Sequence, residues 1–141
     1  MEVFITIITG LIVFVLSQLF LRLVLDPITN MQKVIAEIAF ALINYNQIIQ
    51  NEIKYDDEYK LESEELRKLA SRLYASWKLV PKYSKFRWIF GLPIQNSILR
   101  SCKLLFLLSY NLRMSSSNSD ERVNKKETIE KLLNLGYDKN K

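Results

Sequence analysis

The chain has 141 residues, with 20 Lys and Arg against 15 Asp and Glu, one cysteine and no histidine. These counts exclude a Ser–His or Cys–His nucleophile pair, a histidine-ligated metal, a thiolate zinc site and an intrachain disulfide. Hydrophobic residues make up 49% of the chain, with only three glycines and three prolines. The composition therefore predicts one small all-α protein that is not an enzyme and that carries no cofactor.

Residues 1–26 are predicted to form a transmembrane helix. The nineteen residues from Val3 to Leu21 carry no charge, and a helix of that length covers roughly 28 Å, close to the hydrocarbon thickness of a bilayer. A secretory signal peptide is disfavoured because Glu2 follows Met1 and no A-x-A-like cleavage site occurs. A buried core helix is the other alternative. Arg22 and most other basic residues follow the span, which predicts an external amino terminus and a cytoplasmic domain.

One face of the predicted span is small or weakly polar. It combines a small-residue seam with a polar patch at the cytoplasmic end: Thr6, Gly10, Val13 and Ser17, then Gln18 and Arg22. Small residues let helices approach closely in lipid, and a glutamine inside a span usually finds a protein partner or water. This face predicts self-association, with a pore as one form of the assembly. The alternative is a lone anchor, whose hydroxyls bond to their own helix and whose glutamine reaches the headgroups.

A second, amphipathic helix is expected directly after the span. Asp26 suits an N-cap and Pro27 suits the first helical position, so the two predict an end to the span. Apolar residues then recur every three or four positions: Ile28, Met31, Ile35, Ile38, Leu42, Tyr45 and Ile49. Such a seam serves either as a coiled-coil contact between subunits or as the core face of a bundle helix. Val34, Ala41 and Ile48 widen the stripe, which favours the core.

Residues 27–113 as a whole are predicted to form a cytoplasmic bundle of about four helices. Ser63 is a candidate cap for a helix that ends near Val80. A short basic and aromatic connector is expected over 82–93, and an almost wholly apolar central helix over 94–113.

The carboxyl end is predicted to hold a linker over 114–120 and a last helix and tail over 121–141. The linker sequence MSSSNSD is typical of a flexible segment. The apolar patch at 129–133 is expected to dock on the bundle or on a neighbouring subunit. Gly136 is predicted to end the helix, because glycine is the usual residue just after a helix C-terminus.

Charge is strongly segregated within the bundle. Between Arg67 and Arg113 there are ten Lys and Arg and no Asp or Glu, with aromatic residues interleaved. The densest part is a basic and aromatic surface of Lys82, Lys85, Phe86, Arg87, Trp88 and Phe90. Such a surface could bind the anionic inner leaflet or nucleic acid. The alternative is a solvated face that is partly neutralised by the acidic 52–65 stretch of the same or a neighbouring subunit. Because the predicted span holds the domain near the headgroups, the lipid bilayer is favoured over nucleic acid.

Three stretches carry a family resemblance: LVLDPI, QKVIAEIAFALINY and LRKLASRLYASWKLVPKY. They resemble a set of small bacterial single-span, membrane-anchored helical proteins of unsettled function. The architecture is also similar to the accessory membrane protein of type VI-B CRISPR systems. That likeness implies a homo-oligomeric inner-membrane pore that acts in antiphage defence, with a CRISPR effector or another cytoplasmic protein as partner. The accessory family carries an Arg followed by a His, whereas Arg100 is followed by no histidine, so that motif is not transferred.

The sequence therefore supports two hypotheses about function. The first is a self-assembling inner-membrane protein, as an oligomeric pore or a membrane effector or accessory in antiphage defence. The second is a membrane-tethered adaptor whose basic and aromatic surface recruits a protein or RNA.

Overall fold

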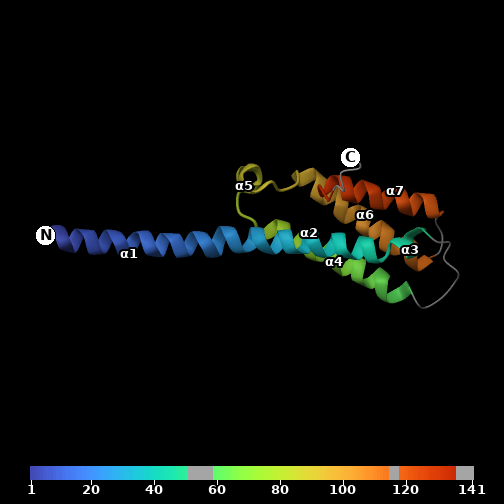
Figure 1. Ribbon diagram of the computed structural model, residues 1–141, viewed down its shortest axis with the longest axis horizontal. Helices are drawn as coiled ribbons and strands as arrows, with labels where there is room; N and C mark the ends of the chain where they lie inside the picture. The colour runs from blue at the N-terminus through green and yellow to red at the C-terminus, as the bar shows by residue number, and fades with distance from the viewer. Residues whose placement is uncertain (51–58, 115–117, 136–141) are drawn as a thin grey trace.

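The computed structural model describes residues 1–50, 59–114 and 118–135, and those residues contain helices and turns but no strand (Figure 1). The elements are α1 (Glu2–Phe20), the π-helical turn η1 (Leu21–Leu25), α2 (Asp26–Asn44), α3 (Asn46–Gln50), α4 (Lys60–Leu79), α5 (Tyr83–Phe90), α6 (Gln95–Met114) and α7 (Ser119–Leu132). The all-α prediction is confirmed for this part of the chain. The expected stop at Gly136 lies outside the described residues.

The first three elements form one continuous helix, Glu2–Asn44, of 43 residues (Figure 1). The predicted break at Asp26 and Pro27 is therefore wrong. The backbone N–H of Asp26 bonds to the carbonyl of Leu21, five residues back, so the helix is widened just before the proline. A proline ring normally clashes with the carbonyl four residues earlier, and a wider turn relieves that crowding. Pro27 consequently continues the helix instead of starting a new one.

Helices α2 and α4 run antiparallel and are joined by two polar pairs. The guanidinium of Arg72 pairs with the carboxylate of Glu37, and the hydroxyl of Tyr45 donates to the carboxylate of Glu65. The later residue on the α2 side, Tyr45, pairs with the earlier residue of α4, Glu65. The end of α4 therefore lies at the same end of the bundle as the start of α2.

Helix α6 is the central helix, since it packs against both α4 and α7. The buried hydroxyl of Ser63 donates a 2.9 Å hydrogen bond to the carbonyl of Ser109, which fastens α4 to α6. The predicted cap role of Ser63 is therefore wrong, because α4 begins earlier, at Lys60. A serine near the start of a helix looks the same in the sequence whether its hydroxyl caps that helix or bonds to a neighbouring helix.

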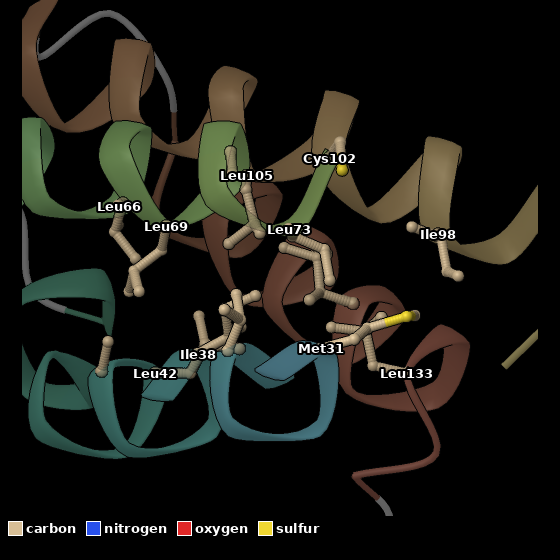
Figure 2. Packing of buried hydrophobic residues seen from close by; sticks show 14 of the residues in the cluster. Met31, Ile38, Leu42, Leu66, Leu69, Leu73, Ile98, Cys102, Leu105 and Leu133 are labelled. Atoms are coloured by element: carbon tan, nitrogen blue, oxygen red, sulfur yellow. The ribbon is translucent and has the colours of Figure 1, made fainter. Parts of the chain in front are cut away.

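The hydrophobic core gathers side chains from α2, α4, α6 and α7 (Figure 2). The face that was predicted as a subunit or bundle seam over 28–49 runs along α2 into α3 and points into this core. Five of its residues are buried and two are half-buried against them: Ile28, Met31, Ile38, Leu42 and Ile49, then Ile35 and Tyr45. Val34 and Ala41 are also buried, so the stripe is as wide as a bundle core requires. This face is used within the chain and is not free for a second copy.

Helix α7 docks on the bundle through its apolar patch. Ile129 and Leu133 are both buried in the core. The side chain of Arg122 is 1% exposed, and its Nε donates a 3.1 Å hydrogen bond to the carbonyl of Ile49, joining α7 to α3. Because α6 extends to Met114 and α7 begins at Ser119, both ends of the expected 114–120 linker are helical.

The segment expected as a connector contains the short helix α5. It is bounded by two residues with left-handed backbone, Lys82 (φ 45°) and Gly91 (φ 62°). Glycine adopts that conformation without the steric cost that a Cβ brings, which explains why α5 ends there. The segment was expected to be a connector without a helix, because eight residues are too few for periodicity to reveal one.

Candidate functional site

Helix α1 is unlike the rest of the molecule because it packs against nothing. Every residue from 1 to 23 is exposed, although most of them are apolar. Figure 1 shows α1 projecting as a rod from one end of the bundle. Within the described residues, the helix that contains it is the one long and apolar enough to cross a membrane.

The hydroxyls of the small-residue seam on α1 are already satisfied by their own helix. Thr6 donates a 2.9 Å bond to the carbonyl of Glu2, and Ser17 a 2.8 Å bond to the carbonyl of Val13. This is the bonding expected of the lone-anchor alternative. Any association of helices through the seam must therefore rest on close packing of their backbones and not on hydrogen bonds from these hydroxyls. Gly10 permits such packing: apart from its chain neighbours and the backbone of its own helical turns, no described atom lies within 4 Å of where its Cβ would be.

The transition from exposed helix to packed helix falls within η1. Gln18 in α1 and Arg22 in η1 are exposed, whereas Val24 is the first residue buried against the bundle. The polar patch predicted at the end of the span therefore lies directly above the bundle. A helix that entered lipid would leave it at about this level.

The two faces of α5 have different roles. Tyr83 is buried, and Phe86 and Phe90 pack half-buried against the core. These two phenylalanines, predicted as part of the basic and aromatic surface, are thus only partly exposed. At helical spacing they share the inner face with Tyr83, so they anchor α5 on the bundle.

The outer face of α5 is apolar as well as basic. Trp88 is 87% exposed and Ile89 is 65% exposed, beside the exposed Lys82 and Lys85. Sequence reasoning missed Ile89 because the segment was not expected to be helical. At about 100° per residue, a helical wheel over 83–90 places it roughly 40° from Lys85 and roughly 60° from Phe86, at the edge of the outer face.

Helix α5 lies at the end of the bundle from which α1 projects. Along the longest axis of the molecule it is level with the junction of α1 and α2 (Figure 1). The neighbouring ends of α4 and α6 add two more exposed apolar side chains, Leu79 and Ile94. The end of the bundle nearest α1 thus carries exposed apolar residues mixed with lysines.

A groove of about 430 Å³ lies between α5 and the facing ends of α6 and α7. Arg87 and Trp88 line it from α5, and Lys131 and Leu132 line it from α7. Among the described residues that line the groove, none is acidic. Lys131 was not singled out by sequence because it is far from α5 along the chain, and only the docking of α7 brings it there.

A second, smaller groove of about 240 Å³ lies on the outer side of α4 and α6. It is lined by Arg67 and Arg113 and by the carboxylate-bearing Glu64. Phe106 and Tyr110 line it too and are exposed. The central helix α6 therefore keeps one uncovered face, although it was predicted to be almost wholly apolar.

Two side chains that could be reactive, Cys102 and Tyr45, have raised pKa values. Burial raises the pKa of the Cys102 thiol to about 11, so the thiol stays protonated at neutral pH. Burial and the hydrogen bond to Glu65 raise the pKa of Tyr45 to about 12. In the described parts of the chain, no cluster of three Cys, Asp or Glu could hold a metal ion.

Comparison of the chain with protein-family models, with curated proteins and with solved structures finds no match. Function is therefore inferred from three features of the molecule itself: the uncovered α1, the exposed outer face of α5 and the basic groove beside it.

Proposed function

We propose that the chain is a single-pass protein of the bacterial inner membrane that self-assembles through α1. The observation that supports this most is the complete exposure of residues 1–23. Each large apolar side chain left in water forgoes about 1.5–3 kcal/mol that burial would supply. A bilayer removes this penalty for all of α1 at once, and the uncharged length from Val3 to Leu21 matches its thickness.

The proposed orientation places the amino terminus outside and the bundle in the cytoplasm. Arg22 lies at the end of the uncharged stretch, and the bundle behind it carries nearly all the remaining lysines and arginines. Basic residues that flank a span are retained on the cytoplasmic side.

Self-assembly is assigned to α1 because the other candidate seam is occupied. The apolar face of α2 is buried in the core, so it offers no contact for a second copy. The face with Gly10 remains uncovered, and small residues are what brings helices together in lipid. Because α1 and α2 are one helix and α2 is locked in the bundle, the direction of this face is fixed relative to the bundle.

In such an assembly the spans pack around Gly10 and the bundles surround them on the cytoplasmic side. Gln18 and Arg22 then form a polar ring at the inner mouth, and arginine rings of this kind favour anions in pores. An oligomeric pore of this form fits a membrane effector or accessory in antiphage defence, the role that the family resemblance implies.

The experiment compares two substitutions on α1 in the full chain. Gly10→Leu fills the seam, whereas Val15→Leu places the same side chain roughly 140° away around the helix, at about 100° per residue. Both proteins should remain in the membrane after alkaline extraction. Disulfide-independent cross-linking in membranes should detect oligomers for wild type and Val15→Leu, and monomers for Gly10→Leu. Extraction of the wild type at alkaline pH would contradict the membrane anchor itself.

A second candidate is a membrane-tethered adaptor, favoured by the outer face of α5. Trp88 stands 87% exposed beside Lys82 and Lys85, an arrangement that suits a protein or RNA partner. This alternative predicts that neutralising these lysines together with Arg87 abolishes partner capture and leaves the oligomer size unchanged. Loss of the oligomer in that variant would instead argue for an assembly role.

A further inference from the structure

We propose that the groove between α5, α6 and α7 binds the phosphate of an anionic phospholipid headgroup, with Arg87 and Lys131 as the cations that hold it. The inference rests on the proposed membrane anchoring by α1. It adds a specific lipid site, and it gives α7, at the far end of the sequence, a role at the membrane.

The charge of the groove fits a phosphate. Arg87 and Lys131 line it from different helices, and none of the other lining residues described is acidic. Within the described chain the salt bridges are made by other residues, so neither cation is neutralised by a carboxylate. An arginine binds phosphate through two parallel N–H donors, and a lysine adds a compact point charge.

The surroundings of the groove fit a lipid. The lining includes the apolar side chains of Trp88, Ile94 and Leu132 beside the two cations. Trp88 is 87% exposed and Ile94 is 53% exposed. Tryptophan settles at the headgroup level of bilayers, where its ring meets acyl chains and its N–H meets water.

The position of the groove places it within reach of the bilayer. Helix α5 is level with the junction of α1 and α2, and this is where the uncharged helix ends (Figure 1). The C-terminal end of α7 also faces α1, since α7 runs back along α6 toward that end of the bundle (Figure 1). A headgroup in the groove would be held by both helices at the membrane surface.

A lipid is favoured over RNA because the site is confined. A volume of about 430 Å³ accommodates one headgroup with part of its glycerol. Single-stranded nucleic acid is instead bound along extended basic tracks with several stacking aromatics. Trp88 is the one aromatic side chain among the described residues lining this groove.

The test uses the full chain reconstituted in nanodiscs of phosphatidylcholine with phosphatidylglycerol, followed by native mass spectrometry of the lipid retained after mild delipidation. We expect the wild type to retain phosphatidylglycerol in clear excess over its share of the bilayer. The double variant Arg87→Gln/Lys131→Gln should lower that retention tenfold or more. The control pair Lys82→Gln/Lys85→Gln removes the same charge from the outer face of α5 and should retain the lipid within about threefold of wild type.

A second readout follows Trp88 directly. In a Trp77→Phe background it is the sole tryptophan, because the chain contains two. Brominated phosphatidylglycerol should quench it more strongly than brominated phosphatidylcholine, and the groove variant should lose this difference. Equal losses in the groove and control pairs, in either readout, would mean diffuse attraction and overturn the site. Retention of RNA in place of lipid would overturn it too.

The failure of this inference is distinguishable from failure of the membrane anchor. All variants are first checked for resistance to alkaline extraction. A wild type that is extracted refutes the proposed function. A wild type that stays in the membrane without retaining phosphatidylglycerol refutes the groove alone.

Discussion

The hydroxyl of Tyr83 donates a 2.6 Å hydrogen bond to the carbonyl oxygen of Pro93. This bond joins the first residue of α5 to the segment that leads into α6, so it closes α5 into a loop fastened at both ends. Tyr83 is buried, and so is Pro93. The outer face of α5, with Trp88 and Ile89, is therefore presented by a clamped helix.

Removing this clamp should loosen α5 selectively. Tyr83→Phe leaves the buried carbonyl of Pro93 without its partner, which costs about 1 kcal/mol. We expect amide hydrogen exchange in α5 to speed up about fivefold while exchange in α4 is unchanged. Exchange in α5 at the wild-type rate would show that the phenylalanines of its inner face hold the helix without the hydroxyl.

Two tyrosines should lose their protons at a higher pH than a free tyrosine does. Burial raises the pKa of Tyr83 to about 12, and burial with the Glu65 hydrogen bond raises that of Tyr45 to about 12, against about 10 for a free tyrosine. The folded state favours their neutral forms, so this stabilisation is complete below pH 10 and is lost between about pH 10 and 12. Absorbance at 295 nm should show a late phase that shrinks in Tyr83→Phe. A single phase near pH 10 would contradict the burial of Tyr83 and the hydrogen bond of Tyr45 to Glu65.

Core packing on α6 can be tested with a matched pair of leucines. Leu105 is buried in the cluster of Figure 2, whereas Leu107 is 49% exposed on the same helix. Leu105→Ala should lower the unfolding free energy of the bundle by about 2–5 kcal/mol, and Leu107→Ala by much less. Denaturation of the full chain in mild detergent measures both. Equal losses would mean that the face with Leu107 is covered, for example by a second subunit.

The polar links of α4 should differ in strength. Ser63 bonds to Ser109 within the core, so Ser63→Ala should destabilise the bundle by about 1 kcal/mol. The pair of Arg72 and Glu37 is exposed to solvent, and Arg72→Gln should cost less than about 1 kcal/mol. The same denaturation series decides the ranking, and a larger loss for Arg72→Gln would contradict it.

The long-range features of this fold are the ones that the sequence could not predict. The helical class, the exposed span and the core face of α2 follow from composition and from local periodicity, which depend on neighbouring residues alone. The continuity through Pro27 depends on a π turn, which has no sequence signature. The bond of Ser63 to α6 and the approach of Lys131 to Arg87 both depend on helix packing. The groove exists only because α7 docks on α6.

The central claim is that α1 is both a membrane span and the contact between copies. The most direct test is the mass of the purified full chain in detergent, measured by light scattering coupled to size exclusion, for wild type, Gly10→Leu and Val15→Leu. We predict a discrete oligomer for wild type and Val15→Leu, and a 16.6 kDa monomer for Gly10→Leu. A wild type that is strictly monomeric, or an oligomer that Gly10→Leu leaves intact, would contradict assembly through this face of α1.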